Sequence, residues 1–273
     1  MTPAAKRTAV AEMQAHTAIS ERRACQLVGL ARSTLRYEPR PSCDNDVLQV
    51  RIVELAQERR RFGYRRIHAL LRREGTEVNH KRTYRLYREA NLAVRQRKRR
   101  QGVAVSREPL TLPEVRNAVW SMDFIFDSLS TGRRLKVLAI VDDCTKELVD
   151  LVADSSISGH YVCRVLDRAC RFRGYPQAIR TDQGPEFTGK ALDQWAYQHG
   201  VELKLIQAGK PTQNAFVESF NGKFREYCLD LNWFSGIDDA RSTIDTWRKH
   251  YNHVRPHRSL GKIPPAVFAE QVA

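Results

Sequence analysis

The sequence lacks several features that would place it in a common class of protein. No apolar run approaches the roughly 18 residues that a helix needs to cross a bilayer. The opening stretch MTPAAKRTAVAEMQ contains no apolar signal core, so we expect a cytoplasmic protein. The six cysteines form no CxxC pair, which argues against both a disulfide framework and a zinc ribbon.

The charge is unevenly distributed along a chain of 273 residues with a net charge of +15. Residues 59–100 hold 16 Lys and Arg against three acids, a net charge of +13. Residues 119–273 hold 20 Lys and Arg against 19 acids, a net charge of +1. A basic run is often only a solvated face. Here the basic residues alternate with a helical apolar pattern, which favours a surface that binds a polyanion.

The first part of the chain reads as short helices. Residues 20–38 predict two of them, with Ser20 capping the first and Gly29 making the turn. This is a helix-turn-helix pattern, and a plain helical hairpin is the alternative. Further helices are predicted at 44–59, at 64–74 and from Asn79 to Ala90. The last two contain many Arg residues, so the three helices resemble a small DNA-binding module in outline.

From Val119 the pattern changes to strands. VWSMDFIF (119–126) alternates, so Asp123 and Ile125 face one side while Met122 and Phe124 face the other. The remaining predicted elements are strands at 135–143, 147–153, 177–182 and 201–206, and helices at 159–173, at 189–199 and from Gln213. This order predicts an α/β domain with a mixed sheet that is covered on both faces.

Three acids stand out in this half. Asp123 lies in mid-strand, where an acid is depleted and costly to bury. Asp182 ends a strand just before Gly184-Pro185, and is therefore expected at the carboxyl edge of the sheet. Glu218 lies on the helix from Gln213. The apolar stripe of this helix is predicted at Val217, Phe220, Phe224, Tyr227 and Leu231, and its polar face at Asn214, Glu218, Asn221 and Arg225.

Three converging carboxylates would repel one another and raise one pKa. Two divalent metals would remove that conflict and could promote phosphoryl transfer. Oxygen ligands favour magnesium or manganese over zinc. Asp142 and Asp143 are rival candidates because they also lie at a strand end, and Glu186 is a rival because it lies close to Asp182 in the sequence.

Longer motifs carry a resemblance to a known family. WSMDF, TDQGPEF, GKPTQNAFVESFNGKFREYCL and YNHVRPHRSLG resemble the second-reading-frame transposases of bacterial insertion-sequence family three. RRACQLVGLARSTLRY and FGYRRIHALLRREG resemble that family's N-terminal helices. The family belongs to the retroviral-integrase superfamily, with a ribonuclease-H-like core and an Asp-Asp-Glu triad whose last two acids are separated by 35 residues. Here 35 residues separate Asp182 from Glu218, while Gln183 and Tyr227 depart from the family pattern.

The resemblance implies a function. Asp123, Asp182 and Glu218 would be catalytic and would hold two divalent cations, magnesium or also manganese. The chain would nick element ends and transfer strands into target DNA, as a homo-oligomer on DNA and fused to an upstream-frame product. A DNA-binding remnant and a nuclease that cuts without joining are the alternatives.

Basic and polar residues outside the triad are the candidate DNA contacts. Loop positioning would explain Lys210 and Asn214 equally well. The candidates are Arg65, Arg66, Lys81, Arg82, Arg85, Arg97, Lys98, Arg99, Arg100, Lys210, Asn214 and Arg225. His250, His253 and His257 with Cys228 fit no common zinc spacing, so we expect structural roles for them.

These patterns predict five regions. They are a helix-turn-helix-like segment at 1–43, a helical DNA-binding module at 44–94, a basic linker with prolines at 95–117, a catalytic core at 118–232 and a helical extension at 233–273.

Overall fold

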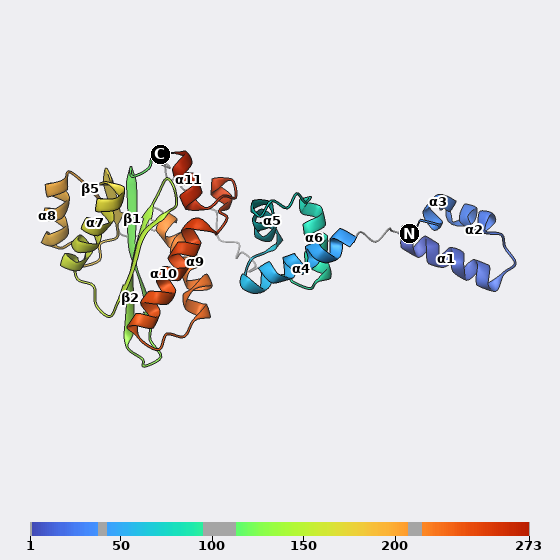
Figure 1. The fold of residues 1–273 in the computed structure, drawn as a ribbon, viewed down its shortest axis with the longest axis horizontal. Helices are drawn as coiled ribbons and strands as arrows, with labels where there is room; N and C mark the ends of the chain where they lie inside the picture. The colour runs from blue at the N-terminus through green and yellow to red at the C-terminus, as the bar shows by residue number, and fades with distance from the viewer. Residues whose placement is uncertain (1, 38–42, 95–112, 207–214, 273) are drawn as a thin grey trace. The chain divides into compact units, whose positions relative to one another are not determined.

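A computed structural model gives the fold of this chain (Figure 1). It describes residues 2–37, 43–94, 113–206 and 215–272. The chain forms two compact units, Met1–Arg51 and Ile52–Ala273, and each is described by itself. Within the described residues, no helix is both long and apolar enough to cross a membrane.

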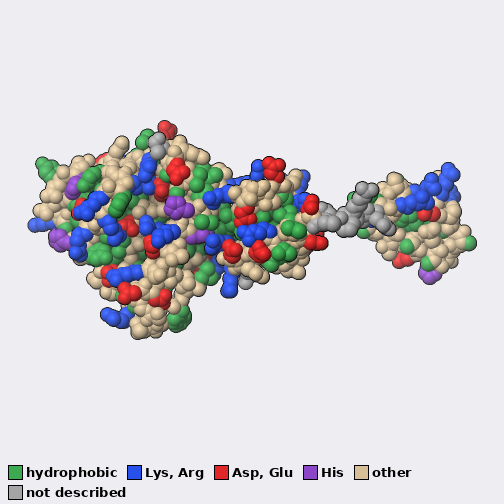
Figure 2. Space-filling model, viewed as in Figure 1, with side chains coloured by type: hydrophobic (Ala, Val, Ile, Leu, Met, Phe, Trp, Pro, Cys, Tyr) green, Lys and Arg blue, Asp and Glu red, His purple; other side chains and the backbone are tan. Residues whose placement is uncertain are grey.

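The first unit contains the two helices that residues 20–38 predict. Helices α2 (Glu21–Val28) and α3 (Arg32–Leu35) follow α1 (Pro3–His16). The Ser20 side chain caps α2, and Gly29 closes it in the left-handed conformation with a φ of 60°. Val10, Ala24 and Cys25 form the small core between α1 and α2. On the face that Figure 2 shows, Lys and Arg side chains gather along one edge of this unit.

Helix α4 (Cys43–Glu58) spans the division between the units. In the second unit, α5 (Tyr64–Arg73) and α6 (His80–Glu89) follow it, as predicted. The Asn79 side chain caps α6 by accepting from the backbone N–H of Lys81 at 2.9 Å. The Tyr87 hydroxyl donates to the carbonyl of Phe62, which ties α6 to the segment before α5. The second unit therefore begins with a small helical module.

A five-stranded sheet forms the centre of the second unit (Figure 1). Its order is β3-β2-β1-β4-β5. The first three strands pair antiparallel, whereas β4 is parallel to both β1 and β5. The bounds are β1 Val119–Ser128, β2 Arg134–Asp142, β3 Leu148–Asp154, β4 Ala178–Thr181 and β5 Glu202–Leu205. The predicted mixed sheet is confirmed.

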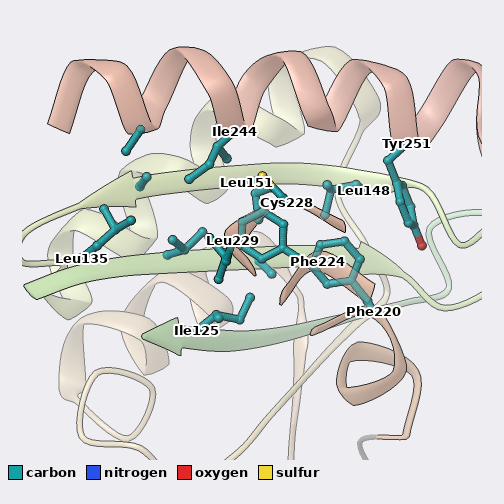
Figure 3. Close-up of a cluster of buried hydrophobic side chains, with 14 of the residues drawn as sticks. Ile125, Leu135, Leu148, Leu151, Phe220, Phe224, Cys228, Leu229, Ile244 and Tyr251 are labelled. Carbon is teal, nitrogen blue, oxygen red and sulfur yellow. The ribbon is translucent and has the colours of Figure 1, made fainter. Parts of the chain in front are cut away.

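Each face of the sheet has its own hydrophobic core. Ile125 of β1 belongs to the cluster with α9 (Ala215–Tyr227) and α10 (Ile237–His253), part of which Figure 3 shows. Met122 belongs to the opposite cluster, with α7 (Gly159–Arg173) and α8 (Lys190–His199). The predicted alternation along β1 is thus confirmed, and it places Asp123 on the α9 face.

The apolar stripe of α9 ends earlier than the sequence pattern predicts. Val217, Phe220 and Phe224 are buried, but the helix stops at Tyr227. The chain then continues in a 3-10 turn, η2 (Leu229–Leu231), whose tighter winding changes the facing of the residues that follow. Cys228 and Leu229 are buried instead, and Leu231 is 49% exposed, so its predicted place in the stripe is wrong. The 3-10 turn η3 (Arg258–Leu260) and helix α11 (Pro265–Gln271) complete the chain.

Candidate active site

The pairing of β1 with β4 aligns two of the candidate acids. Ser121 lies opposite Arg180 in this parallel pair. Continuing the same register by two residues brings Asp123 opposite Asp182, which directly follows the end of β4. Asp123 is half-buried and Asp182 is exposed, as expected for the carboxyl edge of a parallel pair.

Helix α9 brings its polar side to the same edge. Its apolar residues pack on β1 and β2, and this packing fixes the rotation of the helix. The side-chain amide of Asn221 then donates to Oδ2 of Asp123 at 2.6 Å. Glu218 lies almost one turn before Asn221 and is exposed. Asn221 is therefore the direct link between the helix and the acid in β1.

Asp182 and Glu218 lie near enough for their charges to act on Asp123. The pKa of Asp123 is raised to about 6, mainly by burial and also by the negative charges of Asp182 and Glu218. The backbone N–H of Phe124 and the amide of Asn221 oppose this shift by donating to the carboxylate. None of these contributions to the pKa comes from a cation. The negative charge at this edge lacks a positive partner within the described residues.

A tight turn holds Asp182. Its Oδ1 accepts the backbone N–H of Gly184 at 3.0 Å. A Cβ at position 184 would lie only 3.1 Å from that oxygen, so the turn favours glycine for close approach. The nearby Glu186 pairs with the ammonium of Lys136, which lowers the pKa of Glu186. Glu186 is thus already neutralised, whereas Asp182 keeps its second oxygen available.

Asp142 and Asp143 are fully buried and held by arginines. Arg173 donates to Asp142 at 3.1 Å, and backbone N–H groups supply further hydrogen bonds to it. Arg180 donates to Asp143 at 2.6 Å, and the hydroxyl of Ser121 donates to it at 2.7 Å. The protein itself therefore satisfies these rival carboxylates, and their roles are structural.

The donor set at the edge fits a magnesium or manganese site. It consists of carboxylate oxygens, which these hard cations prefer. The Asn221 side-chain oxygen is also buried and has no hydrogen-bond partner among the described residues. No three His, Cys, Asp or Glu side chains in the described ranges are already grouped closely enough to hold a metal. Residues 207–214, which precede α9 in the sequence, lie outside those ranges.

The candidate DNA contacts fall into three groups. Arg65, Lys81 and Arg85 are exposed on α5 and α6. Arg66 and Arg225 are engaged within the protein, with Arg66 donating to the Tyr227 hydroxyl and Arg225 to the carbonyl of Phe126. Arg82 is half-buried and also has an interaction within the protein. Arg97, Lys98, Arg99, Arg100, Lys210 and Asn214 lie outside the described residues.

Of the three histidines near the C-terminus, His250 is half-buried and His257 is buried, whereas His253 is exposed. Burial lowers the pKa of His250 to about 4 and that of His257 to about 3, so both are neutral at pH 7. The His257 ring packs edge-on against Tyr251. Lys223 and Arg255 line a pocket together with His257. The sequence analysis did not single out either cation, although Arg255 lies within the motif YNHVRPHRSLG.

Known proteins and protein families are similar to this chain over most of its length. Residues 113–211 and 199–265 match models described as an integrase core domain, and residues 43–100 match an HTH-like domain. An insertion element IS407 protein of Burkholderia multivorans is 65% identical, over 92% of this chain and 91% of that protein. An insertion element IS476 protein of Xanthomonas euvesicatoria is 54% identical, over 98% of this chain and 78% of that protein.

The putative transposase InsK for insertion sequence element IS150 of Escherichia coli is 26% identical, over 89% of this chain and 90% of that protein. This chain belongs to the family of insertion-element transposases with an integrase core domain. The predicted resemblance is confirmed.

A solved structure supports the fold of the transposase chain. A chain of the simian T-cell lymphotropic virus intasome, in complex with the PP2A regulatory subunit B56 gamma, aligns with a TM-score of 0.55 at 13% identity. The alignment covers 80% of this chain and 74% of that chain. The mixed sheet with helices on both faces is the ribonuclease-H-like fold of integrase cores, preceded by an HTH-like domain.

Proposed function

We propose that this transposase cuts the ends of its insertion element and joins them to target DNA, with Asp123, Asp182 and Glu218 as the ligands of two divalent cations. Integrase cores typically use divalent metal. The observation that carries the assignment is the unmatched negative charge around Asp123, whose pKa is raised to about 6. Asp142 and Asp143, by contrast, already have arginine partners.

The side chains would have distinct tasks in this reaction. Bound magnesium or manganese would supply positive charge to the attacking and leaving oxygens of phosphoryl transfer. Asn221 orients Asp123 through its amide, and the N–H of Gly184 orients Asp182. Glu218 would complete the ligand set from α9. These supports pre-organise the acids before substrate binds.

The reaction has two phosphoryl-transfer steps at one site, first a hydrolysis and then a transesterification. Water attacks the phosphodiester at the element end, which breaks the bond to the 3′ oxygen and frees a 3′-hydroxyl. That hydroxyl then attacks a target phosphodiester, forms a new phosphorus–oxygen bond and releases the target's own 3′ oxygen. The protein contributes positioning and charge, and no covalent intermediate with the chain is needed.

Binding of DNA would be shared between the helical segments and the core. The HTH-like match at 43–100 overlaps the basic stretch 59–100. We place the helix-turn-helix-like segment at 1–43, the helical module at 44–94, the linker at 95–117, the catalytic core at 118–232 and the helical extension at 233–273. The chain would act in the cytoplasm of a bacterium, at the nucleoid, as an oligomer on DNA.

Fusion to an upstream-frame product is a further part of the proposal. Each good bidentate base contact gives about 1–3 kcal/mol of discrimination, so specific recognition of a long terminal repeat needs several modules. We expect the 273-residue chain alone to bind DNA with little sequence preference. The test compares end cleavage on matched and scrambled repeats, with and without the fusion. Equal discrimination by both proteins would show that no fusion is needed.

One assay separates the proposed activity from its alternatives. Labelled element ends are incubated with target DNA, magnesium and the fused protein, and nicked and joined products are resolved by size. A transposase gives both products, and a nuclease gives nicked ends alone. A DNA-binding remnant gives neither. Absence of joined product from correctly paired ends would overturn the proposed function.

A further inference from the structure

A second charged site lies beside α9, and its charge is positive. A pocket of about 460 Å³ is lined by Arg66 of α5, Lys223 of α9 and the segment between α10 and η3. That segment contributes Arg255 and His257, and Arg258 follows at the start of η3. The lining contains four cationic side chains and no carboxylate from the described part of the chain.

Two of the lining side chains are deeply buried with unused hydrogen-bonding capacity. Arg255 is 2% exposed, and its guanidinium carbon lies 4.0 Å from the centre of the Tyr227 ring. Its Nη2 atom has no hydrogen-bond partner among the described residues. His257 is 5% exposed, and its Nε2 atom is buried and unpartnered in the same way. Unpaired buried donors are rare, because each loses its bonds to water.

The cations also act unfavourably on one another. The pKa of Lys223 is lowered to about 8, mainly by burial and also by the positive charges of Arg255, Arg66 and Lys146. Burial lowers the pKa of Arg255 as well, and Arg66 adds to that shift. Arg66 donates to the Tyr227 hydroxyl at 2.9 Å, and no carboxylate of the described residues lines the pocket to balance these charges. An anion with several oxygens would supply both the missing acceptors and the missing charge.

We propose that this pocket binds a phosphate group of the DNA backbone, apart from the carboxylates of the active site. Arginine donates to phosphate oxygens in a fixed fork, lysine adds a point charge, and a neutral imidazole donates through one N–H. Lys223 follows Glu218 by five residues, or about 7.5 Å along the axis of α9. One helix thus carries both a ligand of the cations and an anchor for the strand.

The same chemistry could come from free phosphate. The choice of the backbone as the source rests on the proposed function, whereas the affinity of the pocket for phosphate does not. The first experiment therefore uses inorganic phosphate as the probe, with thermal unfolding of the full chain at constant ionic strength and without divalent metal. Phosphate should raise the melting temperature of the native chain, because it binds only the folded pocket.

Two substitutions test the pocket without disturbing its most buried arginine. Lys223→Gln removes a lining charge and Arg258→Gln removes an exposed one. Both should reduce the phosphate-induced shift, and the double variant should abolish it. Lys249→Gln is the matched control, because it removes one charge from α10 at a residue paired with Asp245. An unchanged shift in the double variant would overturn the proposal. Arg258→Gln alone keeps the test valid if the Lys223 variant does not fold.

The second experiment uses duplex DNA in EDTA and measures affinity against salt concentration. Removing one phosphate contact should reduce the slope of log affinity against log salt by about 0.9 in the double variant, and Lys249→Gln should leave it unchanged. A reduced phosphate shift with an unchanged DNA slope would mean that free phosphate is the ligand and would overturn the backbone assignment. Because neither readout requires cleavage, a failure of the proposed catalysis would be seen separately, in the cleavage assay alone.

Discussion

Two groups of acids lie in or beside strands of the same sheet, and they differ in what surrounds them. Asp142 ends β2 and Asp143 follows it; both are fully buried, and each accepts a hydrogen bond from an arginine. Asp123 and Asp182 face α9 and Glu218, and the charges that act on Asp123 are negative. The first group is complete without a ligand, whereas the second has the composition of a cation site. The role of an acid in this sheet is thus indicated by the charges around it rather than by its position in a strand.

The largest expected difference between the two groups of acids is in catalysis. Asp182→Asn or Glu218→Gln should each reduce end cleavage and joining roughly 10³-fold or more, because each removes a ligand from a site that acts as a unit. The double variant should be no worse than either single one. The measurement is product formation from labelled ends, with DNA binding as the control that stays intact. Strand transfer retained in either single variant would remove that residue from the site.

For the acids that have arginine partners, we expect substitution to reduce stability. Asp143→Asn should lower the free energy of unfolding by about 3 kcal/mol, because it leaves the mostly buried Arg180 without its ionic partner. Asp182→Asn serves as the control and should change stability by about 0.5 kcal/mol or less, since Asp182 is exposed. Urea unfolding measures both. Equal losses in the two variants would mean that the two groups do not differ as described.

Metal should distinguish the groups through stability. A ligand that binds only the folded chain at 100 times its dissociation constant adds about 2.7 kcal/mol. Magnesium or manganese should therefore raise the melting temperature of the native chain. The Asp123→Asn, Asp182→Asn double variant should show no such shift, and the Lys249→Gln control should keep it. A shift of equal size in the double variant would place the metal elsewhere.

The smallest expected effect is on DNA binding by the basic stretch 59–100, whose positive charges we expect to be neutralised by DNA phosphates rather than by acids of the protein. Replacing Arg97, Lys98, Arg99 and Arg100 with Ala should flatten the salt dependence of DNA binding by about 0.9 for each phosphate that the protein no longer neutralises. Affinity should fall similarly for element ends and for unrelated DNA. A slope that does not change would identify this run as a solvated linker.

Local patterns predicted much of the fold. The Ser20 cap, the Gly29 turn and the alternation along β1 depend on residues close in sequence, and the structure confirms them. Helix α1 was not predicted, because it buries only Val10 and shows no clear apolar stripe. The end of α9 was misplaced because nothing local distinguishes a 3-10 turn from another turn of α-helix at Leu229.

The sequence predicted the three acids of the candidate site, but it did not distinguish them from the rival acids. The three candidates follow from an acid in mid-strand at Asp123, an acid after a strand end at Asp182, the polar face of a helix at Glu218, and the family resemblance. Their distinction from Asp142 and Asp143 required Arg173 and Arg180, which come from α7 and β4 and meet those acids only in the fold. Pairings between residues distant in sequence leave no periodic signal. For the same reason, the sequence did not reveal the pocket around Arg255.

Metal stoichiometry tests the central claim most directly. Manganese would be titrated calorimetrically into the chain bound to a duplex that ends in the element's repeat, with Glu218→Gln and Asp143→Asn measured in parallel. The native chain should bind two ions at this site. Glu218→Gln should lose at least one of them, while any folded Asp143→Asn protein should keep both. Two ions bound equally well by the Glu218→Gln variant would contradict the assignment of the three acids as one metal site.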